Sequence, residues 1–296
     1  MRMAVIVNPA AGTADDRAPV EELRARLTGA GHSAEWLETT GPGQARRLAA
    51  SASTGCDAVI AAGGDGTLNE VVNGLADADA LGRVAVAVLP IGTGNDFARS
   101  LGVEAPTAAL DAIVSGATRA IDLAMLGDRA FLNASAGGFT AETSAHVNSA
   151  LKQAVGRAAY LVGGVRAFLE HEPVPARVEA DGRVIEDDLR LFAVCNGAWI
   201  GGGHQLAPTA RPDDGVMEVC LVRARSALDF IALLPRLSVG THVDDEDVAY
   251  FRARAVTCSF GRPIKVNTDG EVLEASQCAY TLRPGAVRFL CPAPGA

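Results

Sequence analysis

The first 122 residues alternate between apolar runs of strand length and stretches with the apolar spacing of amphipathic helices. Three of the apolar runs, residues 3–7, 58–62 and 84–89, are nearly continuous, as expected for strands buried inside a parallel sheet. A further strand is predicted at residues 32–37, and helices at residues 20–27, 44–51, 67–75 and 106–115. This alternation predicts a Rossmann-like α/β domain.

The pattern changes after residue 119 to short strand-length pieces separated by Gly, Pro and Asp. Residues 174–184 alternate around Asp181-Gly182, which predicts a β-hairpin. Further strands are predicted at residues 189–195, 216–222, 249–260, 263–267 and 274–282, with one helix at residues 227–237. Many short strands at this spacing predict a β-sandwich-like second domain.

We place the domain boundary near Asp122. The division gives an α/β domain at residues 1–122 and a β-rich domain at residues 123–285. Residues 286–290 are apolar, so we expect the tail, about residues 286–296, to pack back on the first domain.

Three predicted strands of the first domain end in turns of glycine and small or polar residues. The turns are residues 8–12, 63–69 and 92–96. Because parallel strands share one carboxyl edge, where open α/β folds bind their ligands, the turns together predict a nucleotide-binding crevice. Each turn by itself is also explained as a plain connection.

The central turn suits a phosphate. Gly63, Gly64 and Gly66 have no Cβ, so a phosphate can approach the backbone N–H groups, and the next helix points its positive end there. We expect Thr67 to cap that helix. Asp65 would repel a bare phosphate unless Mg²⁺ or a transferable proton lies between them, which favours a metal–nucleotide.

Composition narrows the classes of partner. The chain has 296 residues, a formal charge of −9 and a pI near 5.1, which argues against a nucleic-acid binder. No apolar run reaches the roughly 18 to 20 residues that span a bilayer. The apolar start is too short for a signal peptide, so we expect a cytoplasmic protein, peripherally associated with the inner membrane face. Six scattered cysteines without a C-x-x-C pair favour free thiols.

Residues 151–170 are a predicted helix that carries both basic and aromatic residues. A surface with both features could touch a membrane, and an ordinary amphipathic helix with a solvated face explains it as well.

The turn sequences resemble a known family. The segments N-P-x-x-G at the start, AAGGDGTLNEVVNGL at residues 61–75 and GTGNDFA at residues 92–98 are similar to the diacylglycerol kinase catalytic-domain family. That family includes bacterial lipid kinases, sphingosine kinases and ceramide kinases, and is distantly related to NAD kinases. FLNASAGGF at residues 131–139 extends the resemblance into the second domain. The resemblance implies an NAD kinase/diacylglycerol kinase-like fold, with an α/β domain and a β-sandwich-like domain.

The resemblance also implies which residues bind ATP. Thr39 falls where the family places a nucleotide-contacting threonine, and fits the spacing slightly better than Thr40. The full predicted ATP-binding set is Asn8, Pro9, Ala10, Ala11, Gly12, Thr39, Gly63, Gly64, Asp65, Gly66, Thr67, Leu68, Asn69, Gly92, Thr93, Asn95 and Asp96. Mg²⁺ would be held near the phosphates through Asp65, Asp96 or water.

A second Mg²⁺ site is implied by the A-P-x-A…D-G pattern at residues 207–215. By the resemblance Asp214 supplies a carboxylate and Arg211 and Val216 supply backbone carbonyls, with Asp213 beside them. Without the family, the same residues describe a loop that ends in an Asp-Gly turn.

The catalytic carboxylates are predicted in the D-G-E segment at residues 269–271. Asp-Gly after a strand is an ordinary hairpin turn, but the family uses this segment for catalysis. We nominate Asp269 as the base that accepts the proton of the acceptor hydroxyl, with Glu271 as an alternative base or its partner. Asp65 completes the predicted catalytic set.

The resemblance therefore implies an ATP- and Mg²⁺-dependent lipid kinase. The acceptor is expected to be diacylglycerol or a related lipid alcohol such as phosphatidylglycerol, and sphingoid bases stay open. One alternative is a kinase of a soluble acceptor such as NAD, and another is a catalytically silent, nucleotide-responsive regulatory protein. The expected partner is a membrane lipid, and an exposed sheet edge could pair two subunits as a homodimer.

Overall fold

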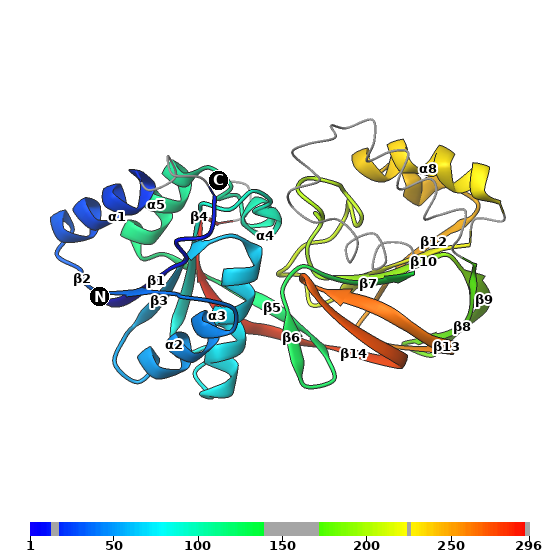
Figure 1. Cartoon of the computed structure of the whole chain (residues 1–296), viewed down its shortest axis with the longest axis horizontal. Helices are drawn as coiled ribbons and strands as arrows, with labels where there is room; N and C mark the ends of the chain where they lie inside the picture. The colour runs from blue at the N-terminus through cyan, green and yellow to red at the C-terminus, as the bar shows by residue number, and fades with distance from the viewer. Residues whose placement is uncertain (13–17, 139–171, 224–225, 294–296) are drawn as a thin grey trace.

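The computed structural model describes residues 1–12, 18–138, 172–223 and 226–293. Figure 1 shows two lobes, and long strands run from one lobe into the other. In the described residues all the strands are joined in one 14-stranded sheet that passes through both lobes. The predicted fold class, an α/β part followed by a β-sandwich, is confirmed.

The first lobe is a parallel sheet with helices on both faces. Its strands lie in the order β2 (Ser33–Glu38), β1 (Arg2–Val7), β3 (Ala58–Gly63) and β4 (Ala85–Pro90). Helices α1 (Ala18–Gly29) and α5 (Pro106–Ser115) pack together on one face, and α2 (Gln44–Ala52) and α3 (Asp65–Asp77) on the other (Figure 1). A short helix, α4 (Asp96–Ser100), follows β4. Every residue of β3 and β4 is buried, which explains their continuous apolar sequences.

The second lobe is antiparallel. From one edge its strands run β12 (Val248–Ala253), β11 (Met217–Val222), β10 (Leu191–Cys195), β7 (Ala134–Gly138) and β13 (Ala255–Thr268). The hairpin of β8 (Val174–Ala180) and β9 (Arg183–Leu189) joins β13, and helix α8 (Ala227–Val239) and the short helix η2 (Thr241–Asp244) connect β11 to β12. The predicted turn between β8 and β9 is confirmed, because Asp181 and Gly182 have φ of 46° and 88°.

Two strands belong to both lobes. Strand β5 (Thr118–Leu126) continues into the second lobe, where it pairs with β6 (Arg129–Phe131), and Asp122 lies in the middle of β5. Strand β14 (Glu271–Leu290) begins beside β13 in the second lobe and ends beside β4, where Phe289 pairs with Val86. The end of β14 contributes Phe289 to the core of the first lobe, and its middle contributes Tyr280 to the core of the second.

Several predicted strand boundaries in the second lobe are wrong. The predicted strand at residues 249–260 is divided between β12 and β13, and β13 continues through Pro263 to Thr268. Strand β14 continues through Pro284 and Gly285, where the prediction ended a strand. The pairing register shifts between Ser259 and Ile264 and between Arg283 and Val287. Pro263, Pro284 and Gly285 therefore lie at irregularities inside long strands, where a residue without a pairing partner is tolerated.

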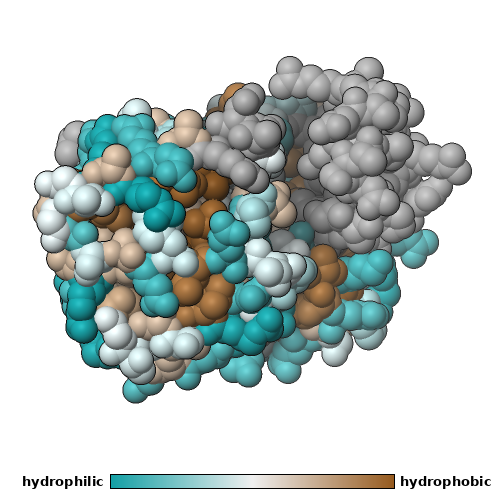
Figure 2. Space-filling model, turned by 60° about the vertical axis from the view of Figure 1, so that its left-hand side comes forward, coloured by the Kyte–Doolittle hydropathy of each residue, from teal (hydrophilic) through white to brown (hydrophobic). Residues whose placement is uncertain are grey.

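The described surface is mixed in polarity. On the face shown in Figure 2, hydrophilic residues cover much of the visible surface, and hydrophobic residues show in narrow strips between them. None of the helices in the described residues is long and apolar enough to cross a lipid bilayer. All six cysteines are free thiols, as predicted.

Candidate active site

The three glycine-bearing turns meet at the carboxyl edge of the parallel sheet. Strands β1, β3 and β4 are neighbours, so the turns that follow them lie side by side. The Asn8 amide donates to the Thr67 hydroxyl at 3.0 Å, which joins the first turn to the second. The Asp65 carboxylate accepts the N–H groups of Asp96 at 3.1 Å and Phe97 at 2.9 Å, which joins the second turn to the third. The turns thus form one continuous surface.

The N-terminus of helix α3 opens onto this surface. The helix begins at Asp65, and Gly64 at the N-cap position supplies no side-chain hydrogen bond. The prediction that Thr67 caps this helix is wrong, because the helix starts two residues earlier and the Thr67 hydroxyl bonds to Asn8. Backbone N–H groups in the first turn of a helix without a side-chain cap are a favourable place for an anion.

The glycines of the turns have different steric roles. A Cβ added at Gly92 would lie 2.5 Å from the Gly64 Cα, so the close approach of the second and third turns requires glycine. A Cβ at Gly66 would meet no atom within 4 Å. Gly66 therefore leaves open space at the start of α3, of the kind that a bound phosphate would fill.

Asp96 connects this surface to the second lobe. Its carboxylate accepts the Arg99 guanidinium at 3.0 Å and the Gly202 N–H at 2.8 Å, and only 5% of the residue is exposed. Burial raises the pKa of Asp96, and the nearby Asp65 carboxylate raises it further. Gly202 has φ of 83°, a conformation that favours glycine.

The carboxylates of Asp65 and Asp96 are compatible with Mg²⁺. Each accepts two hydrogen bonds among those described above, and a carboxylate offers about four lone-pair sites. Two neighbouring carboxylates with hard oxygen atoms suit this ion, either directly or through water.

Thr39 and Thr40 differ in their contacts. Thr39 is buried at the end of β2, and its N–H donates to the Val7 carbonyl at 2.9 Å, next to the first turn. The Thr40 hydroxyl bonds to Gln44 at the start of α2. These contacts place Thr39 beside the first of the three turns and use the hydroxyl of Thr40 elsewhere.

Glu70 makes a structural contact near the site that the sequence analysis missed. Its carboxylate accepts the N–H groups of Gly43 at 2.7 Å and Ala45 at 2.9 Å, so it fixes the start of α2 from helix α3. The only sequence signal is that Gly43, at the N-cap of α2, offers no side chain for this purpose.

Asp269 lies at the tip of the β13–β14 hairpin and reaches both lobes. It accepts the N–H groups of Leu132 at 2.7 Å, Asn133 at 3.2 Å and Ala134 at 3.0 Å, and the Asn69 amide of α3 at 2.9 Å. Burial raises the pKa of Asp269, and these N–H donors oppose the rise. The bonds occupy the lone pairs that Asp269 would need in order to accept a proton.

Glu271 lies beyond the turn, at the start of β14. Its carboxylate pairs with Arg129 at 2.6 Å, and 53% of its side chain is exposed. Glu271 therefore makes one ion pair and is largely open to solvent, whereas Asp269 accepts the N–H groups of four residues.

The loop at residues 211–216 contains the predicted metal ligand Asp214. Burial raises the pKa of Asp214; the Val216 N–H and the Arg252 guanidinium lower it, and the carboxylates of Glu218 and Asp122 raise it. The Oε2 atom of Glu218 is buried without a hydrogen-bond partner. The other oxygen of Glu218 pairs with Arg252 at 2.9 Å, so the Asp214 carboxylate and the Oε2 atom of Glu218 are the anionic oxygens here that are compatible with Mg²⁺.

Within the described ranges, no three or more His, Cys, Asp or Glu side chains are arranged to hold a metal ion. An ion at the loop would therefore depend on Asp214 together with backbone carbonyls and water. The predicted roles of the Arg211 and Val216 carbonyls stay a prediction. The loop is fixed by Asp122 of β5, whose carboxylate accepts the Gly215 N–H at 2.7 Å.

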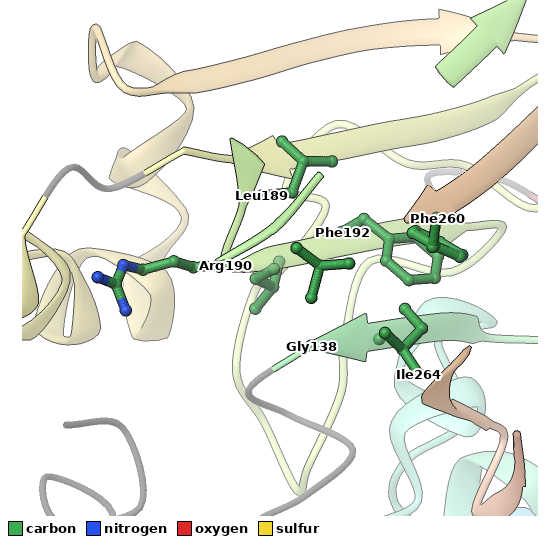
Figure 3. Close-up of a pocket in the computed structure, with 9 residues that line it drawn as sticks. Gly138, Leu189, Arg190, Phe192, Phe260 and Ile264 are labelled. Carbon is green, nitrogen blue, oxygen red and sulfur yellow. The ribbon is translucent and has the colours of Figure 1, made fainter. Parts of the chain in front are cut away.

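The second lobe has an apolar pocket at the end of β7. The pocket is small, and Figure 3 shows Leu189, Phe192, Phe260 and Ile264 grouped around it, while Arg190 extends away. The predicted helix at residues 151–170 follows β7 in the chain and lies outside the described residues.

The family models, the similar sequences and the similar structures all match diacylglycerol kinases or lipid kinases. The model of the diacylglycerol kinase catalytic domain matches residues 2–126, and that of the YegS C-terminal NAD kinase beta sandwich-like domain matches residues 133–291. A diacylglycerol kinase of Bacillus subtilis is 33% identical over 273 residues, which cover 91% of this chain and 89% of the relative. A Pseudomonas fluorescens protein named "Probable lipid kinase YegS-like" is 37% identical over 278 residues, covering 93% and 90%. A crystal structure of a diacylglycerol kinase from Bacillus anthracis aligns with a TM-score of 0.79 at 25% identity, covering 100% and 98%.

Proposed function

The chain belongs to the diacylglycerol kinase catalytic-domain family and is a phosphotransferase of the lipid kinase type; we propose that it transfers the γ-phosphoryl group of ATP to a lipid hydroxyl. The proposed acceptor is diacylglycerol, which would give phosphatidic acid, or a related lipid alcohol such as phosphatidylglycerol. The relatives' names support this acceptor class.

One observation carries the proposal. The uncapped N-terminus of α3 lies among the three joined turns, and the same helix is hydrogen-bonded through Asn69 to the carboxylate hairpin of the second lobe. The proposed phosphate-binding surface and the hairpin that carries the two carboxylates are thus connected by one helix. Phosphoryl transfer depends mainly on such positioning and on charge neutralisation.

The proposed ATP site is the carboxyl edge of the parallel sheet. The N–H groups at the start of α3 would hold the terminal phosphates, and Gly66 would leave them room. The other proposed contacts are Asn8, Pro9, Ala10, Ala11, Gly12, Thr39, Gly63, Gly64, Asp65, Thr67, Leu68, Asn69, Gly92, Thr93, Asn95 and Asp96.

Mg²⁺, when bound with ATP, would neutralise the charge that develops on the phosphates. Asp65 and Asp96 are the residues that would hold it at the nucleotide. Asp214 and the carbonyls of Arg211 and Val216 would hold a second ion in the loop of the second lobe.

We propose that Glu271 accepts the proton of the lipid hydroxyl. As the hydroxyl oxygen forms its bond to the γ-phosphorus, the bond to the bridging oxygen of ADP breaks and the proton passes to the Glu271 carboxylate. The free oxygen and exposure of Glu271 support this choice over Asp269, which the sequence analysis nominated. Asp269 would hold the hairpin at the correct distance from α3.

The acceptor would reach the site from a membrane surface. This requires peripheral contact of a cytoplasmic protein with the inner membrane face, which we propose from the lipid acceptor. A homodimer through a sheet edge is also proposed, and β2 lies at the end of the strand order, where it could pair with a second copy.

Transfer of radiolabelled γ-phosphate from ATP·Mg²⁺ in mixed micelles tests the proposal. The acceptors are diacylglycerol, phosphatidylglycerol, ceramide and sphingosine, with NAD in a parallel reaction. We expect label on diacylglycerol or phosphatidylglycerol. Label on NAD alone would assign the chain to the kinases of soluble acceptors, and ATP binding without transfer would favour a regulatory protein.

A further inference from the structure

Helix α3 contains two buried asparagine residues whose hydrogen bonds connect it to the second lobe. Asn69 and Asn73 are one turn apart on the same face, and 7% and 5% of these residues are exposed. Asparagine is a poor helix former, and a buried amide without partners is costly. Two such residues on one buried face therefore need a structural reason in the groups that they contact.

Asn73 acts as a strand partner for β6. Its Nδ2 donates to the Ala130 carbonyl at 3.0 Å, and its Oδ1 accepts the Ala130 N–H at 3.2 Å. Among the described strands β6 pairs only with β5, so its other edge faces α3 and needs such a partner. The backbone of Ala130 has a fixed donor and a fixed acceptor, and these determine which way the Asn73 amide is turned.

The orientation of Asn73 determines that of Asn69. The Nδ2 of Asn73 also donates to the Oδ1 of Asn69 at 2.9 Å, so the Asn69 oxygen faces Asn73. The Nδ2 of Asn69 is then the atom that faces Asp269 and donates to its Oδ2 at 2.9 Å, with a longer contact of 3.5 Å to the Ala130 carbonyl. A flipped Asn69 amide would place its oxygen against the Asp269 carboxylate, which is repulsive.

We propose that Asn73 is a positioning residue: it fixes the Asn69 amide with its N–H toward Asp269, and so sets the distance between α3 and the hairpin that carries Glu271. The inference rests on the proposed function, because α3 holds the phosphates and Glu271 takes the proton in that account. The same relay joins the lobes at Ala130 and at Asp269. Loss of this hydrogen-bond relay should therefore slow the phosphoryl-transfer step more than it weakens ATP binding.

Asn73→Leu tests the inference, because leucine is close in size and can neither donate nor accept a hydrogen bond. We expect kcat for lipid phosphorylation to fall by about tenfold to a hundredfold, with the KM for ATP changed by less than about threefold. Val72→Ala is the matched control, since it removes buried atoms from the same helix without touching the relay, and kcat should then be unchanged. Tryptophan fluorescence checks folding, and Asn73→Ser replaces Asn73→Leu if the latter does not fold.

A double-mutant cycle with Asn69→Ala separates positioning from general packing. If Asn73 acts through Asn69, adding Asn73→Leu to Asn69→Ala should change kcat by no more than about twofold. Independent, multiplicative losses would overturn the inference, as would a wild-type kcat in Asn73→Leu. If the wild-type protein phosphorylates no acceptor, the proposed function fails, and the reaction role of Asn73 fails with it. If the two substitutions were then non-additive in the free energy of unfolding, this would show only that the two amides are coupled in the fold.

Discussion

Substituting Asp65 by asparagine tests what holds the three glycine-bearing turns together. The Asp65 carboxylate accepts the N–H groups of Asp96 and Phe97 at 3.1 and 2.9 Å, at the start of α4. The amide of Asp65→Asn has one oxygen for two donors, so one bond is lost and an NH₂ group faces an N–H. A hydrogen bond to a charged group contributes roughly 1.5–3 kcal/mol, and we expect the lower half of that range because Asp65 is partly exposed.

The expected result is a free energy of unfolding lower by about 2 kcal/mol, measured by urea denaturation followed by tryptophan fluorescence. ATP affinity, measured by isothermal titration calorimetry, should also fall, because the third turn would no longer be fixed beside the second. Asp111→Asn is a control that removes an exposed carboxylate from α5, and it should leave both quantities nearly unchanged. An Asp65→Asn protein with wild-type stability would refute this structural role and leave the carboxylate with its proposed metal role alone.

Three further predictions follow from the contacts. Glu271→Gln should lower kcat, measured by label transfer, by about 10²–10⁴-fold with little loss of stability. Asp269→Asn should lower the free energy of unfolding, measured by denaturation, by about 2–4 kcal/mol, and the reverse pattern would exchange the two roles. Gly66→Ala should stabilise the nucleotide-free protein by up to about 1 kcal/mol while weakening ATP binding in calorimetry, whereas Gly92→Ala should destabilise it by about 1–3 kcal/mol. Gain of ATP affinity in Gly66→Ala would contradict the phosphate position. Iodoacetamide should modify Cys56 before the five buried thiols, as read by peptide mass spectrometry, and early labelling of a buried cysteine would contradict the packing of the cores.

The meeting of the three glycine-bearing turns was predictable from sequence because its determinants are local. Each turn follows directly on an apolar run, and parallel strands necessarily bring their ends to one edge. The hairpin at Asp181-Gly182 was predictable for the same reason, since both φ values are set by two adjacent residues.

The remaining features depend on contacts between distant residues. Pro263 and Pro284 resemble strand ends in sequence, yet both lie inside long strands whose register shifts there, and only the neighbouring strands decide this. The bond between Asn69 and Asp269 joins residues 200 positions apart. No local pattern distinguishes such an asparagine from one on a solvated helix face, so the relay through Asn73 could be found only from the structure.

The most direct test of the central claim is label transfer from γ-labelled ATP·Mg²⁺ to diacylglycerol in mixed micelles, with wild-type protein and Glu271→Gln at equal concentration. We predict labelled phosphatidic acid from the wild-type protein and a signal lower by about a hundredfold or more from the variant. Equal labelling by both proteins would remove Glu271 from the mechanism. Absence of label from diacylglycerol and from every other lipid, with ATP binding intact, would contradict the assignment as a lipid kinase.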